Sequence, residues 1–266
     1  ALHRIAYLLY KEENLNYNNI LIFSPNSVFS EYISDVLPEL GEANVLNTTF
    51  NDLVKSYIKK QKNIETFSGF LERKYESINT DDCLYTQNEL DAFIKQFLSK
   101  SILKYGITIN GFYFNQFELN ELLTNKYKKL PYLDRIDSIA EYICNSVNIS
   151  VKKNKTKIKN RLLKEIDIEL NPINIYKQFL ESKNNGKEIN KMIYYDDLVN
   201  IIYIYFELNG YPYNANVKHI VVDEAQDYSK LQFLILKKIF PYAYFTILGD
   251  VNQAINPYCE YNSLEE

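Results

Sequence analysis

Polar side chains follow two apolar segments near the end of the chain. Asp223 and Glu224 come directly after Ile220–Val222, and Gln253 lies a few residues beyond Thr246–Leu248. In α/β proteins, ligands bind where parallel strands end at the carboxyl edge of the sheet. One carboxylate at such an edge can hold Mg²⁺, and a second can orient or deprotonate an attacking water during nucleotide hydrolysis. A neutral glutamine can hydrogen-bond a phosphate oxygen or that water without adding negative charge.

A plainer interpretation of both segments stays open. Asp223-Glu224 is also typical of an acidic turn between a strand and a helix, with Asp227 capping a helix over residues 229–239. Gly249-Asp250 is a common turn dipeptide. The same arrangement on two strands, with Gly249 22 residues after Asp227, favours the functional interpretation.

The surrounding segments predict a parallel sheet. Four apolar runs are typical of strands, over residues 19–25, 44–50, 219–222 and 244–248. Helical periodicity separates them over residues 27–40, which end at Gly41, and over residues 231–239. Strands that alternate with helices form parallel sheets with crossover helices.

The middle of the chain is mostly helical in pattern. Thr86 and Glu89 form a capping box at the start of one helix, and Gly210 follows a strongly apolar helix over residues 194–208. Asn-Gly between apolar runs predicts a tight hairpin over residues 107–114. The sequence therefore predicts an α/β fold whose parallel sheet is split by a mostly α-helical insertion. We expect the sheet domain in residues 1–55 and 190–266, and the insertion in residues 56–189.

Composition excludes several classes of protein. A net charge of −4 and a pI near 5.5 argue against a chain that grips nucleic acid over its whole surface, although local basic patches remain. Cys83, Cys144 and Cys259 fit neither a disulfide framework nor a zinc site and indicate a reducing compartment. No apolar run approaches the roughly 20 residues that a bilayer requires. We expect a cytoplasmic protein without a membrane segment or signal peptide.

At these residues the sequence resembles the superfamily 1 helicases related to UvrD, Rep and PcrA. Asp223–Asp227 resembles their Walker B motif, and Gly249–Gln253 resembles their third motif. The segments that resemble the HelD-like branch, whose members associate with RNA polymerase, are residues 23–26, 34–41, 48–50 and 245–250. The resemblance covers residues 1–55 and 190–266, and it implies the RecA-like core of a P-loop NTPase.

The resemblance implies a role for each motif residue. Asp223 would be the Mg²⁺ ligand, Glu224 the catalytic carboxylate, and Gln253 the sensor of the γ-phosphate of ATP. The residues that would couple this site to the next motif are Gln226, Asp227 and Asp250. The residues that would approach a nucleic-acid strand are Phe23, Ser24, Asn26, Thr49 and Phe50. Phe23 and Phe50 are more often core aromatic residues, so that alternative stays open.

A P-loop, which supplies the amides and the lysine that hold the β- and γ-phosphates, does not occur in the sequence. Residues 1–7 resemble the helix that follows the P-loop in HelD-like proteins. We therefore expect a fragment of the first motor domain that lacks both the P-loop before it and the second motor domain after it. ATP and Mg²⁺ would then act in the intact parent and would not bind tightly to this chain alone. The strands ending in Ser24, Asp223 and Gly249 would be neighbours, and the missing P-loop strand would leave an edge along which two chains could dimerise.

One departure from the family concerns base stacking. Motors related to UvrD carry a Tyr and a Trp soon after the third-motif glutamine, and bases stack on them. Here Asn256 follows Gln253-Ala254-Ile255 and the chain has no Trp, so only Tyr258 or Tyr261 could substitute.

Residues 152–164 carry seven positive charges and no acidic residue. The run includes Lys152, Lys153, Lys155, Lys157, Lys159 and Arg161. It indicates contact with phosphates or with an acidic groove of a partner, or else a solvated helix face in a lysine-rich chain. Two interpretations also stay open for Asp196 and Asp197, which are either a functional pair of carboxylates or caps of the apolar helix that follows.

Three functions are compatible with these observations. The first is an ATP-dependent DNA helicase or translocase-like motor acting on single-stranded DNA, which the motifs around Phe23 and Thr49 favour. The second is a factor that binds and remodels RNA polymerase with the same fold, which the acidic pI and the absence of Trp favour. The third is a non-catalytic interaction module, against which Asp223, Glu224 and Gln253 argue.

Overall fold

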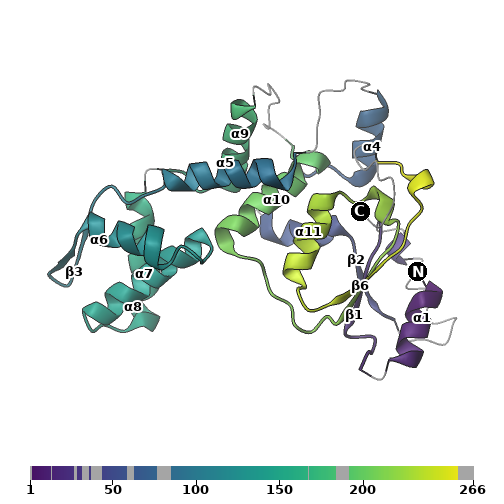
Figure 1. Ribbon diagram of the computed structural model, residues 1–266, viewed down its shortest axis with the longest axis horizontal. Helices are drawn as coiled ribbons and strands as arrows, with labels where there is room; N and C mark the ends of the chain where they lie inside the picture. The colour runs from purple at the N-terminus through teal and green to yellow at the C-terminus, as the bar shows by residue number, and fades with distance from the viewer. Residues whose placement is uncertain are drawn as a thin grey trace. The chain divides into compact units, whose positions relative to one another are not determined.

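The computed structural model describes residues 2–12, 14–26, 29–31, 36, 44–58, 63–76, 85–166, 168–183 and 192–256. The chain divides into two compact units (Figure 1). Unit 1 comprises residues 1–84, 190–199 and 212–266, and unit 2 comprises residues 85–189 and 200–211. Helix α10, Tyr195–Asn209, begins in unit 1 and ends in unit 2.

Unit 1 contains a four-stranded parallel sheet. Its strands are β1 (Ile20–Phe23), β2 (Leu46–Thr48), β5 (His219–Val222) and β6 (Tyr244–Ile247). The order across the sheet is β2-β1-β5-β6, and every neighbouring pair is parallel. Phe23 pairs with Val222, and Val222 pairs with Ile247, so the polar residues that follow these strands lie at one edge. The predicted α/β class and the predicted order of the three site strands are confirmed.

Helices cover both faces of this sheet. Ile20 and Ile22 of β1 pack with Ile5 of α1 (Leu2–Lys11). Phe23 points to the opposite face, since side chains alternate along a strand. It contacts Phe240 at the end of α11 (Lys230–Ile239), with ring centroids 6.3 Å apart. Burial on both faces explains why the two central strands, β1 and β5, carry apolar runs rather than an alternating pattern.

Short polar side chains begin the helices near the carboxyl edge. Thr49 accepts the backbone N–H of Asp52 at the start of α3 (Phe50–Lys55), which continues into the 3₁₀ turn η1 (Ser56–Ile58). The Thr66 hydroxyl accepts the N–H of Gly69 in α4 (Phe67–Glu76) at 3.1 Å. Ser229 and Gln232 form a capping box at the start of α11. These caps fix where each of the three helices begins.

A network of charged groups joins two distant segments of unit 1. The backbone N–H of Glu65 donates to the carbonyl of Ile193 at 2.9 Å. Arg73 of α4 donates two hydrogen bonds to the Glu65 carboxylate, of 2.8 and 2.9 Å, and one of 2.9 Å to Asp196 in the first turn of α10. Glu65 also accepts the N–H of Tyr195, at 2.8 Å, so its carboxylate satisfies the start of α10. These contacts therefore hold residues 65–73 against residues 193–196 within unit 1.

Unit 2 is mostly helical. Its helices are α5 (Gln87–Ser99), α6 (Gln116–Glu121) with the π-helical turn η2 (Leu122–Lys126), α7 (Tyr132–Ser146), α8 (Val151–Glu165) and α9 (Pro172–Ser182). The predicted capping box of Thr86 and Glu89 is present. The predicted hairpin is β3 (Ile107–Ile109) paired with β4 (Phe112–Phe114). Its turn residues Asn110 and Gly111 have φ of 49° and 82°, which explains the Asn-Gly sequence.

Part of the predicted pattern lies outside the described residues. Of the helix expected over residues 27–40 and of the resemblance over residues 34–41, the structure describes only residues 29–31 and 36, all helical. Gly41, Tyr258 and Tyr261 are likewise not described. The apolar helix predicted before Gly210 is α10, and Gly210 has the positive φ of 83° that a helix end of this kind requires.

Candidate functional site

The end of β5 presents two carboxylates in different surroundings. Asp223 is 9% exposed, and its backbone N–H donates to the carbonyl of Phe23 at 3.0 Å. Burial raises the pKa of the Asp223 carboxyl above its ordinary value. Glu224 has a left-handed backbone, with φ 49° and ψ 45°, which is uncommon outside glycine and is found at functional sites.

We expect Asp223→Asn to raise the melting temperature at pH 7. Burial raises the pKa of Asp223 in the folded state, so ionisation of this carboxyl opposes folding. The stability that the protonated carboxyl contributes is fully present below about pH 3.9, the ordinary pKa of an aspartate, and is lost as pH rises through the folded-state pKa. The isosteric amide removes that opposition. Thermal unfolding from pH 4 to pH 8 should show a difference from wild type that grows with pH, and a pH-independent difference would contradict the argument.

A chain of hydrogen bonds connects Glu224 with Gln253. Buried Gln226 donates through Nε2 to Oε2 of Glu224 at 2.6 Å, and its Oε1 accepts the backbone N–H of Asp250 at 3.0 Å. Oδ2 of Asp250 then accepts Nε2 of the exposed Gln253 at 3.1 Å. Asp250 also caps the 3₁₀ turn η4 (Val251–Gln253) through the N–H of Asn252. The structure thus brings the ends of β5 and β6 into one polar network.

Gly249 permits the close approach of these two strand ends. A Cβ at this position would lie 2.3 Å from Oε1 of Gln226, 3.0 Å from the amide nitrogen of Ala225 and 3.1 Å from that of Gln226. Gly249 has no positive φ. The glycine is therefore required by contact between the two motifs rather than by turn conformation.

Gly249→Ala is expected to destabilise the fold by about 1–3 kcal/mol, because the added methyl must displace Gln226 or the backbone beside it. Denaturant unfolding measures the change. Gly69→Ala is the control, since the nearest atom to its Cβ is the Thr66 hydroxyl at 3.3 Å, and we expect no destabilisation because alanine is the better helix former within α4. Equal effects at the two glycines would contradict this role for Gly249.

Asp227 does not cap the following helix. Its Oδ1 accepts the backbone N–H groups of Ile255 and Asn256, both at 2.9 Å, and Asn256 donates through Nδ2 to the Asp227 carbonyl. Burial raises the pKa of the Asp227 carboxyl, while these two backbone hydrogen bonds act to lower it. The capping interpretation is wrong because Ser229 occupies the N-cap position. Asp227 instead anchors the chain just beyond Gln253.

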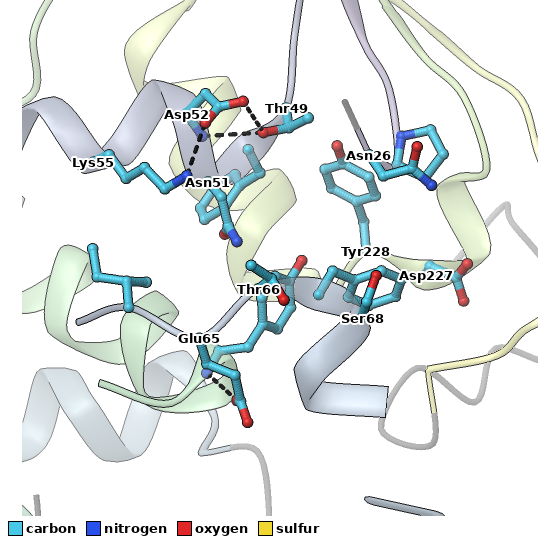
Figure 2. A pocket seen from close by; sticks show the side chains of 15 residues that line it. Asn26, Thr49, Asn51, Asp52, Lys55, Glu65, Thr66, Ser68, Asp227 and Tyr228 are labelled. Atoms are coloured by element: carbon cyan, nitrogen blue, oxygen red, sulfur yellow. Dashed lines mark hydrogen bonds and ion pairs between the residues drawn. The ribbon is translucent and has the colours of Figure 1, made fainter. Parts of the chain in front are cut away.

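A cavity of about 260 Å³ lies within unit 1 (Figure 2). Figure 2 shows Asn26 and Tyr228 on one side of it and Thr49, Asn51 and Asp52 on another. The other lining residues are Pro25, Phe50, Lys55, Ile64, Glu65, Thr66, Phe67, Ser68, Tyr195 and Asp227. Of the five residues predicted to approach a strand, the structure places Asn26, Thr49 and Phe50 on this cavity.

The cavity wall suits a nucleobase better than a phosphate. Among the described residues that line it, Lys55 is the only cation, and its ammonium is 3.0 Å from the Asp52 carboxylate. Glu65 and Asp227 add further carboxylates. Aromatic rings and amides, of which the wall has several, bind the flat face and the polar edge of an unpaired base.

Tyr228 lines the cavity next to Asp227. It directly follows Asp227, is 4% exposed, and its hydroxyl donates to the carbonyl of Ser24 at 3.4 Å. Its ring packs edge-to-face on Phe50, with centroids 6.5 Å apart. Sequence reasoning missed Tyr228, and its place immediately after the Walker B-like segment was the available indication.

Phe23 and Ser24 do not line the cavity. Both are fully buried, and Phe23 packs in the core against Phe240. The Ser24 hydroxyl has no hydrogen-bond partner among the residues that the structure describes. Both residues instead position the end of β1 beside Asp223.

The basic run forms α8 in unit 2. Lys155 and Lys159 pair with Glu141 and Asp137 of α7, at 3.4 and 2.7 Å. The side chains of Lys152, Lys153, Lys157 and Arg161 are exposed. Two lysines of the run therefore hold α8 to α7, and the remaining cations form an exposed basic face of α8.

The donor set at β5 fits Mg²⁺ that is shared with a nucleotide. Within the described ranges, no group of three or more His, Cys, Asp or Glu side chains could hold a metal alone. Asp223 offers one oxygen ligand at a strand end, and Mg²⁺ commonly binds through one or two carboxylates together with substrate phosphates and waters. When bound, Mg²⁺ would neutralise charge on the phosphates.

No helix in the described part of the chain is long and apolar enough to cross a membrane.

The family comparison agrees with this geometry. The family model described as the UvrD/REP helicase N-terminal domain matches residues 2–258. The chain belongs to the UvrD/REP helicase family. The match includes both strand ends of the site and the helical segment between them, whereas no curated protein matches the chain. UvrD/REP helicases are ATP-dependent motors that use Mg²⁺ and bind nucleic acid.

Proposed function

We propose that this chain is part of the first motor domain of an ATP-dependent translocase acting on single-stranded DNA. In this proposal Asp223 holds Mg²⁺, Glu224 orients or deprotonates the attacking water, and Gln253 senses the γ-phosphate. The observation that carries the proposal is the network that runs from Glu224 through Gln226 and Asp250 to Gln253. A shift of Gln253 on contact with the phosphate would, through these hydrogen bonds, change the position of the catalytic carboxylate of Glu224.

The phosphates of ATP require a P-loop, which the sequence does not contain. We propose that an adjoining segment supplies it beside β6, the outer strand of the described sheet, where Tyr244 is 77% exposed. A second motor domain would complete the site. This chain alone is then expected to bind MgATP weakly and to pair with another copy along β6.

The cavity beside Tyr228 is the proposed position of an unpaired base. Asn26, Thr49 and Phe50 line it, and Tyr228 touches both Phe50 and the segment that ends in Asp227. A base in the cavity would contact Tyr228 and so affect the position of the adjoining segment that ends in Asp227. This contact is the physical basis for coupling strand binding to hydrolysis.

The test is ATP hydrolysis by the intact motor with and without single-stranded DNA. Ser68 is exposed on the cavity wall and its hydroxyl has no hydrogen bond among the described residues, so Ser68→Phe is the variant chosen to fill the cavity. We expect this variant to lose most of the DNA stimulation while its unstimulated rate stays unchanged. Ser99→Phe in unit 2 is the control. Hydrolysis that is indifferent to DNA in the wild type would contradict the proposal.

Indifference to DNA would favour the second candidate, an RNA polymerase-binding factor of the HelD-like branch. Its support is the resemblance of residues 23–26 and 48–50 to that branch, together with the exposed basic face of α8 in unit 2. Co-purification of the intact protein with RNA polymerase tests it.

A further inference from the structure

The β3–β4 hairpin of unit 2 presents two aromatic rings to solvent. Phe112 is 60% and Tyr113 68% exposed, although the next residue, Phe114, is buried against Tyr142 of α7. The Tyr113 ring lies over Gly106, where a Cβ would be 2.6 Å from the tyrosine hydroxyl. Because side chains alternate along a strand, Phe112 lies on the same face of β4 as the anchored Phe114, and Tyr113 lies on the other face. Each face of the hairpin therefore exposes one aromatic ring, as binding surfaces commonly do.

The outer face of α8 carries a stripe of exposed lysines. Lys153, Lys157 and Lys164 are exposed and have no ion pair among the described residues. Spacings of four and seven residues place them on the same side of the helix. They are distinct from Lys155 and Lys159, which pair with α7.

This stripe is not explained by helix stability. The first turn of α8 has no acidic residue, and its N-cap, Ser150, makes no side-chain capping bond. Lysines near a helix N-terminus oppose the helix dipole, and like charges four residues apart, such as Lys153 and Lys157, repel each other. Charges that disfavour their own helix, with nothing nearby to compensate, are typical of functional surfaces.

The rings and the lysines belong to one surface. Arg161 of α8 donates through a terminal guanidinium nitrogen to the carbonyl of Thr108 in β3 at 2.7 Å. The N–H of Lys104, just before the hairpin, donates to the carbonyl of Glu165 at the end of α8 at 3.0 Å. Figure 1 shows the hairpin extending from the helices of unit 2.

We propose that this hairpin–α8 surface, formed by Phe112, Tyr113, Lys153, Lys157, Arg161 and Lys164, is a second binding site for single-stranded nucleic acid, separate from the cavity of unit 1. The cations bind phosphates, and the two rings stack with unpaired bases. Duplex bases are already stacked and offer no face to the rings, so the surface prefers a single strand.

The test is fluorescence anisotropy of the full chain with labelled oligo-dT and with a duplex of equal length, over a range of salt concentrations. We expect Lys153→Glu/Lys157→Glu to weaken oligo-dT binding at least tenfold and to reduce the salt slope by about 2. Lys95→Glu/Lys100→Glu, which removes two exposed lysines, one in α5 and one at its C-cap, is the matched control and should change the slope little. A milder pair, Lys153→Gln/Lys157→Gln, should give an intermediate loss.

Phe112→Ala/Tyr113→Ala should weaken oligo-dT binding about fivefold or more and leave duplex binding unchanged. The proposal is overturned if this variant binds oligo-dT as the wild type does, or if the α5 control loses as much affinity as the α8 variant. Wild-type preference for the duplex would also overturn it. Ser68→Phe separates the two sites, because filling the cavity should leave these effects on the hairpin–α8 surface intact.

Discussion

Glu224→Gln should reduce ATP hydrolysis by the intact motor about 100- to 10,000-fold while MgATP binding is retained. The amide has the size of the carboxylate but cannot accept a proton from water. It can still hydrogen-bond to Gln226, which meets Oε2 of Glu224 at 2.6 Å. The loss should therefore fall on the rate constant and not on affinity or folding.

Steady-state hydrolysis and binding of a fluorescent ATP analogue measure the two effects separately. Glu12→Gln is the control, because Glu12 is an exposed carboxylate of unit 1 beyond the end of α1. Hydrolysis that is unchanged in the Glu224 variant would remove Glu224 from the catalytic role. Loss of nucleotide binding would instead assign it to positioning of the phosphates.

The sheet could be predicted because its information is local. Strands buried on both faces read as short apolar runs, and the polar residues that matter follow two of them directly. Thr86 with Glu89, and Asn110 with Gly111, are likewise local patterns that the structure reproduces. In each case a few neighbouring residues determine the backbone.

Asp227 shows where local reasoning fails. Asp227 and Ser229 are both N-cap residue types before the same helix, and the capping-box spacing of Ser229 and Gln232 was the missed local signal that favours Ser229. The role that Asp227 takes instead could not be predicted, because the backbone N–H groups of Ile255 and Asn256 reach it only after β6 has paired with β5.

The cavity could not be predicted for the same physical reason. Its wall comes from five segments, residues 25–26, 49–55, 64–68, 195 and 227–228, which meet only in the folded sheet domain. The resemblance located Asn26, Thr49 and Phe50, because these follow strands. Thr66, Ser68 and Tyr195 carry no pattern in sequence that connects them with those residues.

Arg73→Met is expected to destabilise the fold by about 3–5 kcal/mol, because it leaves the buried Glu65 carboxylate without its cation and Asp196 with only Lys74, 3.8 Å away. Glu65 and Asp196 have side chains only 5% and 10% exposed, and both hydrogen-bond to Arg73. Burial acts to lower the pKa of Arg73, but its pairs with Glu65 and Asp196 outweigh burial and raise it. The Arg73 guanidinium also lies 4.3 Å from the centroid of the Tyr194 ring. Denaturant unfolding measures the loss.

Lys55→Ala is the matched control, because the Lys55–Asp52 pair is half exposed on both sides and such pairs contribute about 0.2–1 kcal/mol. Adding Glu65→Gln and Asp196→Asn to Arg73→Met should restore part of the stability, since the unpaired charges are then gone. A loss at Arg73 no larger than at Lys55 would contradict the network. Because Arg73 and Asp196 are separated by 123 residues, this pair joins two segments of unit 1 that the sequence alone does not connect.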